Sequence, residues 1–185
     1  MTSISEVELY PHVERYLRLE FAPRLKPTLG THLTLASVTA TSGPAGSGKW
    51  SRPDLALVNL WRHKYQPQQH LELYGFEVKR DGGCDLTSVH ETLAHKRLVH
   101  FAYLVWHLKS ANFSDALFAT IKENCAAYGL GLISFSDHRA GSSFVTHLSA
   151  SRGEPDDDAV DEFIETRFDE HQKTRLLSWL RDDWR

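Results

Sequence analysis

Apolar side chains near the start of the chain recur at intervals of three and four residues, the spacing that places them on one face of a helix. The residues with this spacing are Leu9, Val13, Tyr16, Leu17 and Phe21. The pattern predicts a helix over 6–19, and Ser5 with Glu8 has the spacing of a capping box at its start. Pro11 would remove an intrahelical hydrogen bond, so a kink or a later start is an alternative.

Three later segments have the side-chain pattern of β-strands. Residues 31–40 alternate apolar with small or hydroxylic side chains, and a turn-forming stretch, 42–48, comes directly after them. Residues 54–60 and 71–79 form two further strand-like runs, joined by a polar connection at 62–69. Together these segments predict a three-stranded meander.

Two helices are predicted after the third strand. Asp85 is a candidate N-cap for a long helix that runs through Leu108. Ser114 is a candidate N-cap for a second helix that ends near Tyr128, and Gly129 stands where a helix stop is expected.

The rest of the pattern predicts a strand over 130–136, a short strand over 144–148 and an amphipathic helix or helix pair at the C-terminus. The apolar stripe of that last segment consists of Val160, Phe163, Ile164, Phe168, Leu176, Leu180 and Trp184. The late strand must cross over to rejoin the earlier ones, which requires a mixed central β-sheet flanked by helices. The fold class is therefore α/β (α+β), with a core over 1–140 and a C-terminal strand and acidic amphipathic helical extension over 141–185, packed on the same domain.

Composition narrows the class of protein. The chain has 185 residues, 41% hydrophobic and 24% charged, which is ordinary for one globular domain and excludes disorder, collagen and coiled coil. The longest apolar run, 98–108, is about half of a membrane span, and the N-terminus lacks a basic region followed by an apolar run. Cys84 and Cys125 form no Cys-x-x-Cys element. We therefore expect a soluble cytoplasmic protein that has no membrane partner, no disulfide framework and no zinc ribbon.

Charge is divided unevenly along the chain. Residues 154–185 hold 11 acidic and 5 basic side chains, while the other 153 residues hold 13 acidic and 16 basic ones. A mildly basic body suits an anionic partner, although a solvated acidic helix explains the same division. The acidic segment could cap the core, mediate dimerisation or cover a basic cleft as a phosphate mimic, and core capping is the default.

A carboxylate pair and a lysine are predicted to meet at the ends of two strands. Asp54 opens the second strand, and Glu77 and Lys79 close the third, where the pleat points both of them to one face. Adjacent carboxylates repel each other unless a cation lies between them, and Mg²⁺ prefers one or two carboxylates, waters and a substrate phosphate. The pattern therefore predicts a site for a divalent cation with a lysine beside it.

This arrangement resembles the PD-(D/E)XK, or restriction-endonuclease-like, nuclease superfamily, whose signature is Pro-Asp, a spacer, an acidic residue, any residue and Lys. Here it reads Pro53-Asp54 and then Glu77-Val78-Lys79. The order of elements over 6–136 agrees: an acidic first helix, motif carboxylates on adjacent strands, a helix after the lysine and a later helix that leads into a strand. The resemblance implies a restriction-endonuclease-like core and a metal-dependent nuclease.

Carried over position by position, the resemblance implies that Asp54 and Glu77 bind Mg²⁺, for which Mn²⁺ can substitute, and that the Val78 carbonyl completes the coordination. Lys79 would orient the attacking water or help to deprotonate it. When bound, the metal would activate water and offset charge on the phosphodiester during hydrolysis. The implied activity is that of a phosphodiesterase, with an endonuclease acting on DNA favoured.

Further residues are assigned by the same resemblance. Glu6 is a fourth catalytic candidate because it shares a helix face with apolar residues, and Glu14 is the second choice. Glu91 is the secondary candidate on the helix after the lysine, with His95 one turn on; an ordinary surface pair explains them equally well. The cations expected to contact nucleic acid phosphates are Lys49, Arg52, Arg80, Lys96 and Arg97.

Two other functions fit parts of the sequence. A catalytically silent or partner-activated subunit of the same fold would bind nucleic acid or protein in a larger complex, and an exposed sheet edge would allow a homodimer. A nucleotide-binding switch would use 43–49, which matches the glycine and lysine positions of a P-loop. Trp50 replaces the required Ser or Thr, and a strand rather than a helix follows, so a strand connection is favoured there.

Overall fold

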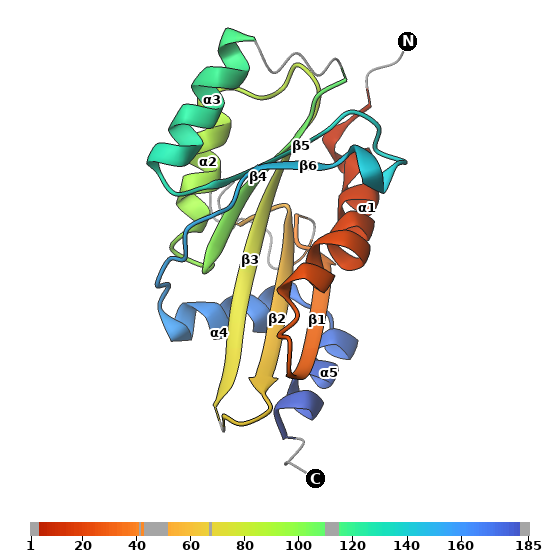
Figure 1. The fold of residues 1–185 in the computed structure, drawn as a ribbon, viewed down its shortest axis with the longest axis vertical. Helices are drawn as coiled ribbons and strands as arrows, with labels where there is room; N and C mark the ends of the chain where they lie inside the picture. Colours follow the sequence, from red (N-terminus) through yellow and green to blue (C-terminus); the bar gives the residue numbers. More distant parts are fainter. Residues whose placement is uncertain (1–3, 41, 43–51, 67, 110–114, 182–185) are drawn as a thin grey trace.

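The computed structural model describes residues 4–40, 42, 52–66, 68–109 and 115–181 (Figure 1). Ser114, Trp184 and the whole P-loop-like stretch 43–49, which includes Lys49, lie outside these ranges. Within them, no helix combines the length and the apolar composition that crossing a membrane requires.

In chain order, the elements of the described chain are α1 (Glu6–Tyr16), η1 (Leu17–Phe21), η2 (Ala22–Leu25), β1 (Gly30–Val38), β2 (Leu55–His63), β3 (Gln69–Lys79), α2 (Leu86–His95), β4 (Phe101–His107), α3 (Ala116–Ala127), β5 (Gly131–Phe135), η3 (Gly141–Ser143), β6 (Val145–Leu148), α4 (Asp157–Arg167) and α5 (Glu170–Arg181). Helices and strands alternate in the described chain only from β3 to β6.

All six strands form one mixed sheet whose spatial order is the chain order, β1 to β6. The first three strands form an antiparallel meander, as the sequence predicts. β3, β4 and β5 run parallel to one another, and α2 and α3 provide the two crossovers; β6 returns antiparallel to β5. The fold is thus α/β with a mixed sheet. The parallel strands β3, β4 and β5 have their carboxyl ends at the same edge of the sheet.

Helices cover both faces of the sheet (Figure 1). One buried cluster joins α1 and its continuation to the sheet residues Phe76 and Val78. The other joins α2, α3, α4 and α5 to the opposite face, which includes Leu73. Because side chains alternate along a strand, Glu77 and Lys79 point away from α1 and toward the face that α2 covers.

The first helix begins where the capping box predicts. Ser5 Oγ accepts a hydrogen bond from the Glu8 N–H at 3.4 Å, and Glu8 Oε2 accepts one from the Ser5 N–H at 2.8 Å. Pro11 lies within α1 on its exposed side, so the alternative of a later start is wrong. Beyond Tyr16 the chain widens into one π-helical turn, which the predicted helix over 6–19 did not anticipate.

The helix predicted over 85–108 is wrong in its second half. α2 ends at His95, and the Leu98 and Val99 N–H groups both donate to the His95 carbonyl. The chain then enters β4, which is buried almost throughout between two parallel neighbours. A strand buried on both faces has a continuous apolar run rather than an alternating one, so periodicity alone does not distinguish it from a helix.

The later elements agree with the sequence except at their ends. α3 begins after Asp115, whose carboxylate accepts the Leu117 N–H at 3.0 Å. Gly129 follows α3 with a φ of 64°, a left-handed conformation that favours glycine as a helix stop. The predicted C-terminal stripe is divided between α4 and α5, and Phe163 and Leu176 bury it in the cluster on the α2 face.

The close approach of β4 to β5 allows a test of the fold. A Cβ at Gly131 would lie 2.1 Å from Cδ1 of Tyr103, its partner in the parallel ladder. The Tyr103 ring is buried and stacked on Phe76, so it has little room to move. We expect Gly131→Ala to lower the free energy of unfolding by about 2 kcal/mol or more, measured by urea denaturation.

Gly153→Ala is the matched control for this prediction. A Cβ at Gly153 would approach nothing closer than 3.6 Å, which is an ordinary contact. The control should unfold within about 0.5 kcal/mol of the wild type. Equal stability of the two variants would show that Tyr103 does not pack against Gly131 as described.

Candidate active site

The end of the β2–β3 ladder places Asp54. The last ladder pair is Leu55 with Phe76, and continuing the register would put Pro53 opposite Val78. The Val78 N–H instead donates to Asp54 Oδ2 at 2.8 Å. The Asp54 carboxylate therefore takes the place of a backbone acceptor at the point where the two strands separate.

The second oxygen of Asp54 is held from the opposite layer. Tyr10, on the buried face of α1, donates its hydroxyl hydrogen to Asp54 Oδ1 at 2.8 Å. Burial and the neighbouring Glu77 charge raise the pKa of Asp54 to about 7, although these two hydrogen bonds oppose the shift. The Asp54 carboxyl group therefore gains or loses its proton near neutral pH.

Glu77 and Lys79 lie at the carboxyl end of β3 within a network of charged groups. Lys79 Nζ is 2.7 Å from Glu77 Oε1 and 2.6 Å from Glu91 Oε2. His95 Nε2 is 2.9 Å from Glu77 Oε2, and an ionised carboxylate there makes Nε2–H the donor. All four side chains are buried, with 1–8% of each residue exposed.

The local sequence of α2 explains how two of these groups arrive there. Asp85 caps the helix directly after β3, and its carboxylate accepts the Ser88 N–H at 3.0 Å while the Ser88 hydroxyl accepts the Asp85 N–H. Glu91 and His95 are four residues apart, so they share one helix face. That face packs on β3, so Glu91 and His95 are not an ordinary surface pair. Glu91 contacts Lys79, and His95 contacts Glu77.

The network fixes the charge state of the β3 residues. Burial works to raise the pKa of Glu77, but hydrogen bonds and charge from His95 and Lys79 outweigh it and lower that pKa. Burial works to lower the pKa of Lys79, but the two carboxylates outweigh it and raise that pKa. Lys79 is therefore an ammonium ion at neutral pH, which suits orienting a reactant rather than removing its proton.

The donor set at this position fits Mg²⁺. Asp54 and Glu77 supply carboxylate oxygens, and the Val78 carbonyl points to the same side of β3 as the Val78 N–H that reaches Asp54. Among the described residues, no three His, Cys, Asp or Glu side chains form a group able to hold a metal, so two carboxylates are the most this site offers. Mg²⁺ commonly binds one or two carboxylates and completes its shell with water and phosphate.

Glu6 lies beside this cluster, over the connection between β3 and α2. Its Oε1 is 3.5 Å from the position that a Cβ on Gly83 would take, and its charge contributes to the raised pKa of Tyr10. Burial is the main cause of that raised pKa, followed by Asp54. Glu14 lies two turns further along the helix, so the structure favours Glu6 of the two predicted candidates.

Two of the predicted phosphate-contacting cations lie near the ends of the motif strands. Arg80 is exposed and follows Lys79 directly in the chain. Arg52 precedes the Pro53-Asp54 motif, and its Nη1 donates to the Ser42 carbonyl at 3.1 Å. Lys49 is outside the described residues.

Lys96 and Arg97 lie elsewhere. They follow α2 on the way to Phe101, which pairs with Tyr74, five positions before Lys79 on β3. Lys96 Nζ donates to the Tyr128 carbonyl at 3.1 Å, at the end of α3. α2 runs back along β3 from Lys79 toward Tyr74, and Lys96 at its end points to α3 rather than to the carboxylates.

Tyr10 is the contact that the sequence pattern did not single out. It lies four residues after Glu6 on the buried stripe of α1, where an apolar role is the ordinary interpretation. The available signal was its phenol group: a buried tyrosine hydroxyl usually has a hydrogen-bond partner, here Asp54.

The raised pKa of Asp54 predicts a pH-dependent stability difference in EDTA. Its folded pKa is about 7 against 3.8 for an ordinary aspartate, so the folded state holds the proton more tightly and loses stability as the pH rises from about 4 to 7. Asp54→Asn carries no such proton. We therefore expect the melting temperature of Asp54→Asn, relative to that of the wild type, to rise by several degrees between pH 5 and pH 8. The corresponding change in the difference in unfolding free energy is on the order of 2 kcal/mol.

Comparing the two proteins at each pH removes the effect of the titrating groups that do not interact with Asp54, and the pH-independent effect of replacing a carboxylate by an amide. Glu14→Gln is the control, because it removes a carboxylate from the same protein outside the network. A wild-type and Asp54→Asn difference that is constant across this pH range would contradict a buried Asp54 that titrates near neutrality.

No protein-family description matches the chain, and no curated protein sequence matches it either. Among solved structures, one that aligns with it is a protein of unknown function from Silicibacter pomeroyi. The two are 12% identical with a TM-score of 0.45, over 98% of this chain and 94% of the other. Function is therefore inferred from the side chains described above.

Proposed function

We propose that this chain is a Mg²⁺-dependent nuclease of the restriction-endonuclease-like type that hydrolyses phosphodiester bonds of DNA. The observation that carries the proposal is the proximity of Asp54 to Glu77 and Lys79 at the point where β2 and β3 separate. The element order α1, β1, β2, β3, α2, β4 around them, with α3 leading into β5, supports the resemblance found in the sequence.

Each residue has a separate task in this proposal. Asp54 and Glu77 would hold Mg²⁺, which when bound activates water and offsets charge on the phosphate during hydrolysis. The Lys79 ammonium supplies positive charge beside them and orients the nucleophilic water. Glu91 and His95 act through their partners: Glu91 fixes the position of Lys79, and His95 fixes that of Glu77. Both are positioning residues.

The charge balance also supports a role for a divalent cation. Asp54, Glu77 and Glu91 can contribute three negative charges, against one positive charge on Lys79. A phosphodiester anion would be repelled by that excess, because like charges in a poorly solvated site interact strongly. Cation binding would reverse the balance, so we expect DNA to enter the site only with the metal.

The second candidate function is that of a nuclease-fold subunit which binds nucleic acid or protein without cleaving. The engagement of Lys79 favours it, because Nζ donates to both Glu77 and Glu91 and so uses two of its three hydrogens within the protein. In a silent subunit this network would serve only to join β3 to α2.

A cleavage assay separates these two functions. Wild type, Lys79→Ala and Glu77→Gln would be incubated with end-labelled single- and double-stranded DNA and RNA in Mg²⁺, Mn²⁺ or EDTA. We expect DNA cleavage by the wild type in either metal, none in EDTA, and a loss of about 100-fold or more in both variants. Lys122→Ala, which removes an exposed lysine on α3, is the matched control and should keep full activity.

Folding is checked in parallel because removing Lys79 leaves Glu77 and Glu91 uncompensated. Lys79→Arg keeps the positive charge and is the second variant; it should fold but position the nucleophile poorly. Unchanged metal-dependent cleavage by a folded Glu77→Gln protein would remove the basis of the proposal. Metal-dependent DNA binding without cleavage by the wild type would favour the silent subunit.

A further inference from the structure

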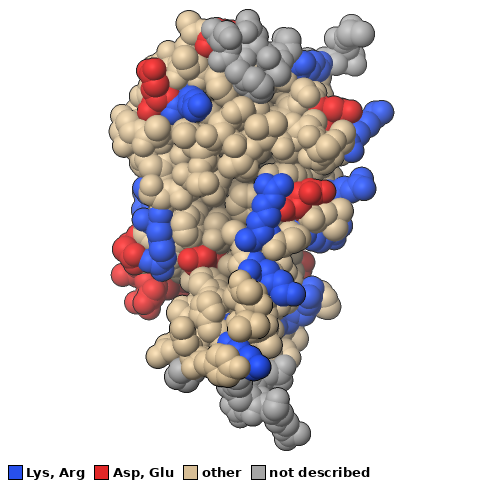
Figure 2. All heavy atoms as spheres, in the orientation of Figure 1, with Lys and Arg blue, Asp and Glu red and all other residues tan. Residues whose placement is uncertain are grey.

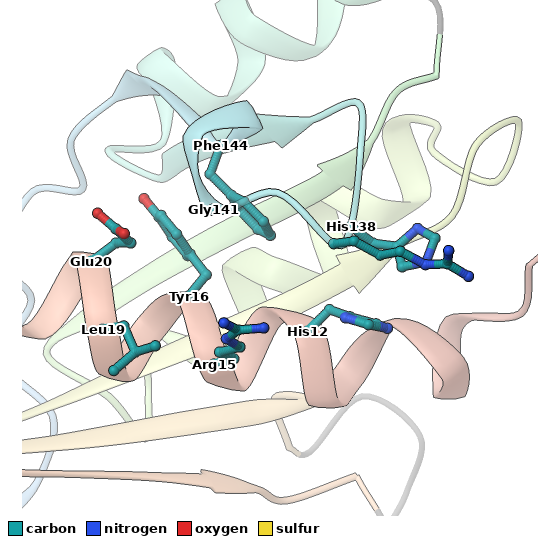
Figure 3. A pocket seen from close by; sticks show the side chains of 9 residues that line it. His12, Arg15, Tyr16, Leu19, Glu20, His138, Gly141 and Phe144 are labelled. Atoms are coloured by element: carbon teal, nitrogen blue, oxygen red, sulfur yellow. The ribbon is translucent and has the colours of Figure 1, made fainter.

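A small pocket lies between α1 and the segment that links β5 to β6 (Figure 3). Its volume is about 90 Å³. The lining residues are His12, Arg15, Tyr16, Leu19, Glu20, His138, Arg139, Gly141 and Phe144. We call it the basic pocket, because two arginines and two histidines line it against one carboxylate.

The basic side chains gather at one end of the pocket. The His12 and His138 rings meet edge to face with centroids 4.5 Å apart, and Figure 3 shows Arg15 beside them on α1. Glu20 lies at the other end, beyond the stacked rings of Tyr16 and Phe144, and its Oε1 faces Gly141. The end of the pocket near His12 is therefore suited to an anion.

The neighbouring side chains do not neutralise this end. No ion pair involves Arg15 or Arg139 among the residues that the structure describes. Asp137 Oδ1 accepts a hydrogen bond from the backbone N–H of Arg139 at 2.9 Å, so this oxygen is used within the loop. Burial lowers the pKa of His12, and His138, Arg139 and Arg15 lower it further, against a smaller opposite effect of Asp137. His12 therefore lies in a positive potential.

The basic pocket and the carboxylates lie at the same edge of the sheet. His107 ends β4 beside the end of β3, where Lys79 pairs with Trp106, and its ring is 6.1 Å from that of His138. α1 links the two places directly, because Tyr10 contacts Asp54 and His12 lines the pocket. Figure 2 shows basic side chains continuing over α1 and the segment after it.

We propose that the basic pocket is a phosphate-binding site, formed by His12, Arg15, His138 and Arg139, that holds a backbone phosphate of a DNA strand which also reaches the carboxylates at the same edge of the sheet. The part that concerns DNA rests on the proposed nuclease function. The phosphate site itself does not, because it follows from the four side chains.

The chemistry of the four groups fits a tetrahedral oxyanion. Each guanidinium offers a planar set of N–H donors that matches phosphate oxygens, and each imidazole can donate one N–H or, when protonated, two. An anion would also offset the positive charge of the two guanidinium groups, and it would favour the protonated form of His12. Binding should therefore raise the pKa of His12 from its lowered value.

The first test uses inorganic phosphate alone with the full chain. Histidine ring signals would be followed by NMR during a phosphate titration at constant ionic strength, with chloride as the competing anion. We expect the His12 and His138 signals to shift saturably and the pKa of His12 to rise. Arg15→Ala and Arg139→Ala should each weaken phosphate binding by about fivefold or more.

Arg18→Ala is the matched control, because Arg18 is exposed one turn along the same helical segment and does not line the pocket. It removes the same charge and should leave phosphate binding within about twofold of wild type. Absence of saturable shifts, or equal weakening by Arg18→Ala, would overturn the phosphate site. Circular dichroism spectra of all three variants check that each is folded.

The second test distinguishes a DNA phosphate from a free one. A ten-residue oligothymidylate would be added with Mg²⁺ to the Lys79→Arg protein, which keeps both proposed metal ligands but positions the nucleophile poorly. If it shifts the His12 signal and competes with inorganic phosphate, the pocket holds a strand; if phosphate binds and the oligonucleotide does not compete, the DNA part is overturned. Since neither readout requires cleavage, failure of the nuclease proposal would leave the phosphate test intact.

Discussion

The Lys79 ammonium group between Glu77 and Glu91 ties the end of β3 to α2, and the arrangement of the site depends on it. Three ionised groups are buried there, and removing charges from water is unfavourable unless each finds a close partner. The distances of 2.6 and 2.7 Å show that both carboxylates have one. Deleting either carboxylate would alter both the position and the pKa of Lys79, whereas deleting the lysine would leave two like charges facing each other.

The two halves of the sheet contribute different parts of the site. In the antiparallel half, β2 and β3 separate beyond the Leu55–Phe76 pair, and the resulting gap is where Asp54 accepts the Val78 N–H. The parallel half brings the carboxyl ends of β3, β4 and β5 to one edge, the position at which open α/β sheets usually bind ligands. The candidate active site and the basic pocket therefore lie at the same edge because of topology, although distant parts of the chain form them.

Much of this could be predicted from short patterns whose physical meaning is local. The capping box at Ser5, the meander and the glycine stop after α3 each depend on a few neighbouring residues, and each lies where the sequence indicates. β4 was mistaken for helix because burial on both faces removes the alternation that marks a strand. Phe101–His107 is recognisable only from the parallel neighbours that enclose it.

In the candidate site, too, the features that depend on neighbouring residues could be predicted, and those that depend on distant segments could not. That Glu77 and Lys79 share a face follows from the pleat, and that Glu91 and His95 share one follows from the helical turn. Which side chains meet across elements does not follow, because it depends on the angle and depth at which a helix packs. Tyr10 reaches Asp54 from the opposite layer, while Lys96 points to the end of α3, and neither contact has a signature in sequence spacing.

The proton on Asp54 links the electrostatics of the site to the proposed order of binding. Burial and Glu77 make a second negative charge unfavourable there, so Asp54 takes up a proton at a pH where an exposed aspartate would be ionised. A divalent cation between Asp54 and Glu77 would offset the same repulsion and displace that proton. The proton and the cation would thus compete for the same position. The phosphate anion would bind only when the cation, and not the proton, occupies that position. The basic pocket carries permanent positive charge from Arg15 and Arg139, so under these proposals it would have no such requirement and would attract a strand before the proposed metal site is filled.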